Sequence, residues 1–126
     1  MRFMVLLEAD EEYYADLTVG DLSQMSKDYT AFYNEFAANI TLSEGFYGVS
    51  DAKTVKSRDG EVTVKDGPSQ AEVQMGGFYL IEARDMDEAI AIVRRNPAIA
   101  YGSAEIRQCT GPIVGARDDR YEAGDA

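Results

Sequence analysis

The segment Phe78-Tyr79-Leu80-Ile81 constrains the fold of this chain more than any other feature of its sequence. It lies in the run from Gly76 to Ala83, whose length and residue types predict a strand. Successive side chains of a strand point to opposite faces of a sheet, so this segment sends two apolar side chains to each face. Both faces of the strand therefore need a layer of the protein to cover them.

One such layer comes from two predicted helices. Thr18 and Asp21 have the spacing of a capping box, which marks a helix start. Asp85 and Glu88 repeat that spacing before a shorter helix, which Asn96-Pro97 ends. The first helix is long, because apolar residues recur at spacings of three and four along one stripe: Leu22, Met25, Tyr29, Phe32, Phe36 and Ile40.

Further strands are predicted at residues 3–7 and 103–109 and in a hairpin. In the hairpin, residues 53–57 and 62–65 alternate around Asp59-Gly60, a pair that tolerates the positive φ of a tight turn. Residues 10–16 are interpreted as a loop and residues 39–49 as a corner. This order predicts an α+β fold with an antiparallel sheet and both helices on one face.

The other face of that sheet has no layer of its own in this element order. A second copy of the chain, packing sheet against sheet, would cover it. A specific interface buries roughly 800 Å² per partner, and a two-fold dimer is the commonest closed assembly. We therefore expect a homodimer.

Charge and residue usage exclude several classes of function. The chain has 23 acidic and 12 basic residues, a formal net charge of −11, which disfavours nucleic acids and anionic membranes as partners. Cys109 is the only cysteine and there is no histidine, which excludes Ser-His-Asp triads, Cys-His pairs and metal sites built on those residues. We expect no metal and no cofactor. The apolar start, residues 1–7, is too short for a signal or a membrane span, so a cytoplasmic protein is expected.

Several segments together point to a known family: Arg2–Leu7, Asp66-Gly67-Pro68, Gly76–Ile81, Asp87-Glu88-Ala89, Asn96-Pro97 and Tyr101–Arg107. With these, residues 1–109 resemble the YCII-related, or DGPF-domain, proteins. The resemblance implies a ferredoxin-like βαββαβ fold that dimerises into an α+β barrel. Residues 110–126 form a separate tail, expected to be flexible or to pack on the partner subunit.

What the resemblance implies about function is limited. Most members of the family look like uncharacterised small proteins, and some are associated with sigma factors. A related branch includes a dehydrochlorinase of chlorinated aromatics, with a His-Asp pair as its suspected active site. This chain has no histidine to supply that pair, and Ser69 stands where the family's motif has Phe.

The loop after the hairpin holds the first candidate residues. Asp66 ends a strand before a glycine and a proline, a position where functional residues collect. It is the candidate proton carrier, and the alternative is a side chain that folds back onto its own turn amides. Gly67 and Pro68 would present backbone amides to an anion or oxyanion.

Four further residues are candidates for ligand binding. Glu72 would supply a second carboxylate, or is simply a solvated loop acid. Gly76 and Gly77 would let a ligand approach the backbone closely, or form a bulge at the strand start. The Tyr79 hydroxyl would point into a pocket, or belongs to a core residue.

Three functions remain open. The leading one is a domain that binds a small molecule or a protein partner without catalysis of its own, because the chain shows no nucleophile–base pair. The second is an enzyme that uses acid–base chemistry centred on Asp66 on a small polar or aromatic substrate; it requires a pocket that holds Asp66 near Tyr79. The third, a transcription-associated accessory protein, rests on the family association alone.

Overall fold

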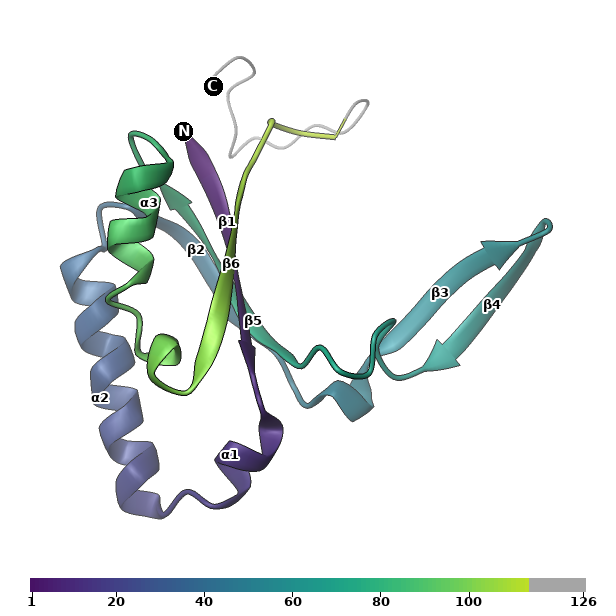
Figure 1. The fold of residues 1–126 in the computed structure, drawn as a ribbon, viewed down its shortest axis with the longest axis horizontal. Helices are drawn as coiled ribbons and strands as arrows, with labels where there is room; N and C mark the ends of the chain where they lie inside the picture. The colour runs from purple at the N-terminus through teal and green to yellow at the C-terminus, as the bar shows by residue number, and fades with distance from the viewer. Residues whose placement is uncertain (114–126) are drawn as a thin grey trace.

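The computed structural model describes residues 1–113, and within them an antiparallel sheet forms the centre of an α+β fold (Figure 1). The helices α2 (Val19–Glu35) and α3 (Met86–Val93) lie on one side of this sheet. Its strands run in the spatial order β2 (Ile40–Gly45), β5 (Met75–Glu82), β1 (Arg2–Ala9) and β6 (Gly102–Gln108).

The chain order β1, α2, β2, β5, α3, β6 is the ferredoxin-like βαββαβ arrangement, as predicted. The corner predicted for residues 39–49 is wrong, because the second strand of that arrangement, β2, lies there. Its residues are mostly exposed at the edge of the sheet, and an irregularity between Ile40 and Leu42 interrupts their alternation. An edge strand of this kind has no apolar run to mark it in the sequence.

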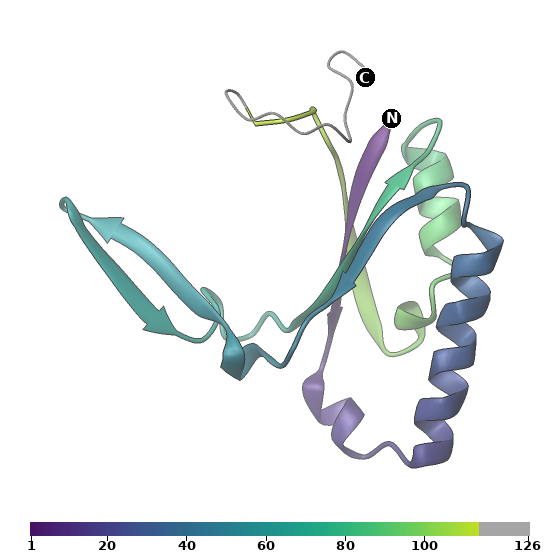
Figure 2. The same ribbon diagram turned by 180° about the vertical axis from the view of Figure 1, so that it is seen from behind.

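The predicted hairpin forms, but it does not join the central sheet. Its strands β3 (Lys53–Arg58) and β4 (Glu61–Asp66) pair with each other as a separate two-stranded sheet, inserted between β2 and β5. Asp59 and Gly60 take φ angles of 53° and 82° at its tip, as the turn requires. Figures 1 and 2 show that this hairpin extends away from the central sheet on the side opposite the helices.

Two other predicted boundaries need correction. The loop predicted for residues 10–16 contains the short helix α1 (Glu11–Ala15), which Asp10 caps by accepting a 2.9 Å hydrogen bond from the amide of Glu12. Five residues are too few to show a helical period in the sequence. The helix α2 starts at the predicted capping box but ends at Glu35, so Ile40, predicted on its stripe, belongs to β2.

The core lies between the helices and one face of the sheet. Phe3, Val5 and Ile81 are almost completely buried there. Phe32 of α2 and Ile92 of α3 pack against them. A fully buried side chain of this size contributes about 1.5–3 kcal/mol to folding, so this layer holds the domain together.

The other face, which we call the open face, is also apolar in its middle. Met4 pairs with Leu80, and Leu6 pairs with Phe78, which places these four side chains on that face. Charged residues flank them, because Arg107 and Glu105 lie opposite Met4 and Leu6 on β6. The helices α2 and α3 lie on the far side of the sheet (Figure 2). The predicted tail, residues 110–126, falls outside the described residues from residue 114 onward.

Candidate functional site

Four tyrosines from three segments of the chain meet beside α2. Tyr13 and Tyr14 come from α1, Tyr29 comes from α2, and Tyr101 follows the 3-10 helix η2 (Pro97–Ala100). The rings of Tyr13 and Tyr101 stack with centroids 4.7 Å apart and planes 7° from parallel, and Tyr14 meets both rings edge-on at 5.8 Å. The hydroxyls of Tyr29 and Tyr101 share a 2.5 Å hydrogen bond. We call these residues the tyrosine cluster.

The position of α1, and hence of two of the rings, is fixed by Glu11. Its amide donates a 2.5 Å hydrogen bond to the side-chain oxygen of Gln74. Its carboxylate accepts a 2.7 Å hydrogen bond from the amide of Val49. One residue thus ties α1 to the segment that precedes β3 and to the loop that precedes β5.

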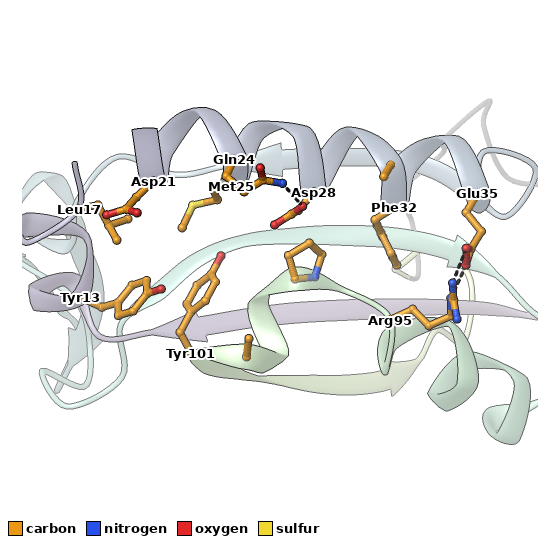
Figure 3. Close-up of a pocket in the computed structure, with 13 residues that line it drawn as sticks. Tyr13, Leu17, Asp21, Gln24, Met25, Asp28, Phe32, Glu35, Arg95 and Tyr101 are labelled. Atoms are coloured by element: carbon orange, nitrogen blue, oxygen red, sulfur yellow. Dashed lines mark hydrogen bonds and ion pairs between the residues drawn. The ribbon is translucent and has the colours of Figure 1, made fainter. Parts of the chain in front are cut away.

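A cleft of about 630 Å³ opens between α2 and the tyrosine cluster, and we call it the tyrosine cleft (Figure 3). The stacked rings of Tyr13 and Tyr101 stand at one end, and the pair formed by Glu35 and Arg95 stands at the other. The full lining comprises Tyr13, Leu17, Asp21, Gln24, Met25, Asp28, Ala31, Phe32, Glu35, Arg95, Pro97, Ala100 and Tyr101.

The charged groups of the tyrosine cleft leave it negative. Arg95 is paired with Glu35, and one of their two hydrogen bonds measures 2.8 Å. These contacts, first the hydrogen bond to Glu35 and then its charge, raise the pKa of Arg95 above its usual value, so Arg95 stays charged and offsets the charge of Glu35. Asp28 accepts a 2.9 Å hydrogen bond from the neutral amide of Gln24. Hydrogen bonds from the backbone and then the side chain of Thr18 lower the pKa of Asp21, which keeps that carboxylate charged.

Three phenols of the cluster, those of Tyr14, Tyr29 and Tyr101, stay protonated at neutral pH. Burial raises the pKa of Tyr29 to about 12. Burial, followed by the mutual hydrogen bonding of the cluster, raises the pKa values of Tyr14 and Tyr101 further still. These phenols can donate and accept hydrogen bonds to a ligand, but they are poor general bases.

Three of the residues predicted from the sequence meet in a second cleft. This cleft of about 290 Å³ lies on the other side of Met25, which lines both, and Gly76, Gly77 and Tyr79 line it together with Tyr14 and Tyr29 of the tyrosine cluster. Burial raises the pKa of Tyr79, so its phenol is also neutral. Met25 thus lines both clefts, and tyrosines of the cluster line each of them: Tyr13 and Tyr101 the first, Tyr14 and Tyr29 the second.

The two glycines of this second cleft have different reasons to be glycine. A Cβ on Gly77 would lie 2.5 Å from the carbonyl oxygen of Glu44, which is closer than real atoms approach. Gly77 is thus required by the pairing of β2 with β5. A Cβ on Gly76 would meet nothing within 4 Å, so that position faces open space.

The remaining predicted residues lie elsewhere. The Asp66 side chain is 85% exposed and forms an ion pair with Lys53 across the base of the β3–β4 hairpin. Gly67 has a φ of 93°, and its amide donates a 2.7 Å hydrogen bond to the carbonyl of Ala52, so Asp66-Gly67-Pro68 closes the hairpin. Asp66 lines neither the tyrosine cleft nor the cleft of Tyr79.

Glu72 lines a third hollow, of about 400 Å³, with Glu8 and Asp10. Asp66 does not line this hollow, so the two carboxylates that the sequence suggested as a pair do not face a common cavity there. Of the tyrosine cluster, the sequence predicted Tyr29 on the stripe of the first helix and placed Tyr13 and Tyr14 in a loop. Their meeting was missed because it depends on where α1 and η2 lie in space.

No group of three or more His, Cys, Asp or Glu side chains within residues 1–113 is arranged to hold a metal ion. No helix in that range is both long and apolar enough to cross a membrane.

Comparisons with known proteins identify a matching family, a relative in sequence and a similar solved structure. The YCII-related domain family matches residues 1–111. An uncharacterised protein of Rhizobium meliloti (strain 1021) is 28% identical over 112 residues, which cover 85% of this chain and 90% of that protein. Among solved structures, 5-chloro-2-hydroxyhydroquinone dehydrochlorinase from Burkholderia phenoliruptrix AC1100, in complex with 2,5-dihydroxybenzoquinone, has a TM-score of 0.48 at 14% identity. That match covers 89% of this chain and 96% of that chain.

Proposed function

This chain belongs to the YCII-related domain family, and from that premise we propose that it binds a small, flat, positively charged molecule in the tyrosine cleft. The observation that carries the proposal is the stacked pair of Tyr13 and Tyr101 beside Asp21 and Asp28, whose hydrogen-bond donors within residues 1–113 are uncharged. Tyr13 keeps 42% of its surface exposed although it is stacked on one side. The negative face of an aromatic ring attracts a cation, and a flat cation also gains contact area with it.

The carboxylates select the sign of the ligand charge. Asp21 and Asp28 receive hydrogen bonds from uncharged groups, whereas the charge of Glu35 is balanced by Arg95. A cationic ligand therefore meets a favourable field, and an anion of the same shape is repelled. The size of the cleft, about 630 Å³, is in the usual range for small-molecule sites.

Binding without catalysis accounts best for the chemistry of this site. The phenols of Tyr14, Tyr29 and Tyr101 hold their protons well above neutral pH. The chain has no histidine to move a proton near neutrality. The acid–base alternative needs Asp66 near Tyr79, but Asp66 is exposed and paired with Lys53 at the base of the hairpin.

Titration calorimetry with three probes of one shape tests this proposal. Benzamidinium, benzamide and benzoate are planar and similar in size, and they carry positive, zero and negative charge. We expect saturable binding of benzamidinium, weaker binding of benzamide and none of benzoate. Asp28→Asn should weaken benzamidinium binding about fivefold, because one partly exposed charge contact contributes about 1 kcal/mol.

Asp66→Asn is the matched control, since it removes the same charge from the hairpin base outside the tyrosine cleft. It should leave benzamidinium binding unchanged. Equal binding of benzoate and benzamidinium, or an equal loss of affinity in both variants, would contradict the proposal.

We also propose that the protein acts as a homodimer through its open face. Met4, Leu6 and Phe78 are half-buried on that face, beside the buried Leu80, with charged side chains on the neighbouring strand β6. An apolar centre with a polar rim is the composition of a protein interface. Sedimentation equilibrium measures the assembly, and a monomer at high micromolar concentration would contradict it.

A further inference from the structure

The β3–β4 hairpin carries apolar side chains that stand largely exposed among the described residues, 1–113. Val55, Val62 and Val64 are 64%, 69% and 65% exposed. In the register of the hairpin, Val55 pairs with Val64 and Ser57 pairs with Val62, so all three valines lie on one face. We call this the valine face.

The opposite face of the hairpin is polar and charged. The pairs Thr54–Lys65, Lys56–Thr63 and Arg58–Glu61 lie there. A two-stranded ribbon is marginally stable in water by itself, and three exposed β-branched residues on one face are the pattern of a strand pair that packs on something. The hairpin thus has one fully polar face and one face on which the three valines lie beyond the Lys53–Asp66 ion pair at its base.

The charge of the hairpin indicates the partner. Residues 53–66 contain four of the 12 basic residues of the chain and three of its 23 acidic residues, so this segment carries +1 while the rest of the chain carries −12. Three of the four basic residues lie on the polar face, so this charge does not pair across the valine face; it lowers the repulsion that the hairpin meets from the acidic body of another copy. The direction of the hairpin fits as well, because it projects on the side of the open face, where a second copy would pack (Figures 1 and 2).

From these observations we infer that the β3–β4 hairpin is an arm that lays its valine face on the body of a second copy of this chain. In a two-fold assembly each protomer gives one arm and receives one. The inference rests on the homodimer proposed above and adds to it, since the two sheets can pack through the open face whether or not the arms engage.

The test has two parts, of which the first needs no variant. Amide hydrogen exchange of residues 53–66 is measured at protein concentrations below and above the dissociation constant found by sedimentation. We expect exchange in the hairpin to slow as the dimer forms. Hairpin exchange that stays fast in a fully dimeric sample would overturn the arm and leave the sheet-to-sheet dimer intact.

The second part uses the triple variant Val55→Thr, Val62→Thr and Val64→Thr, which keeps side-chain shape and β-propensity but makes the valine face polar. We expect the dimer to weaken about 100-fold, because each of the two arms loses three apolar contacts. Thr63→Ser, on the polar face of β4, is the control and should leave the dissociation constant unchanged. An unaltered dimer in the triple variant overturns the arm, and a wild-type protein that is monomeric throughout overturns both the arm and the dimer.

Discussion

Gly76 and Gly77 are neighbours in β5, yet an added methyl group would meet very different surroundings at the two positions. At Gly77 it would collide with the backbone of β2 at Glu44, so Gly77→Ala should push the edge strand away and destabilise the protein by about 1–3 kcal/mol. At Gly76 it would enter open space, so Gly76→Ala should change stability by about 0.5 kcal/mol or less. Urea denaturation of both variants measures the difference, and equal losses would show that close backbone packing is not what requires Gly77.

At the same scale, the sequence predicts the local role of a single residue better than it predicts which other residues that residue contacts. Gly77 is recognisable as a site of close approach, but the neighbour turns out to be β2 rather than a ligand. Asp66-Gly67-Pro68 is recognisable as a turn, but only the pairing of β3 with β4 shows that the turn closes an inserted hairpin. The hydroxyls of Tyr29 and Tyr101 meet across 72 residues of chain, and no local spacing predicts such a contact.

At the scale of elements, the tyrosine cluster makes the junction of α1, α2 and η2 sensitive to high pH. The pKa of Tyr29 rises from 10.0 to about 12 on folding, so the folded state holds this proton more tightly than the unfolded chain. The associated stability is fully present below pH 10.0 and is lost as the pH rises toward about 12. Solvent contact limits the loss from Tyr29 to about 1 kcal/mol.

Urea midpoints measured across this alkaline range would follow the loss, with phenolate absorbance reporting the titration. In the variant Tyr29→Phe, folding stability should decline less steeply with pH, because the hydroxyl whose pKa rises on folding is absent. Tyr33→Phe removes a hydroxyl from an exposed side chain of the same helix and should leave the decline in place. If both variants behave like the wild type, Tyr29 is not coupled to folding in the way the cluster requires.

Elements differ in how well the sequence predicts them, for physical reasons. The helices α2 and α3 begin at N-caps and carry apolar residues at helical spacing, and the strand β5 carries an apolar run. Each is found close to its predicted position. The strand β2 was missed because an edge strand has little to bury, and α1 was missed because its stability comes from the Asp10 cap and the contacts of Glu11. An element is missed from the sequence when its stability comes from tertiary contacts and its own residues show no helical or strand period.

At the scale of the whole molecule, net charge and apolar surface act in opposite directions on self-association. Two copies at −11 each repel one another, while the open face and the valine face gain from contact that salt does not weaken. Added salt screens the repulsion, so the dimer should tighten severalfold between about 0.05 M and about 0.5 M sodium chloride. Sedimentation equilibrium over this range measures the effect. A dimer that weakens with salt would instead show that ion pairs between the basic hairpin and the acidic body dominate the interface, and the valines would then be secondary contacts.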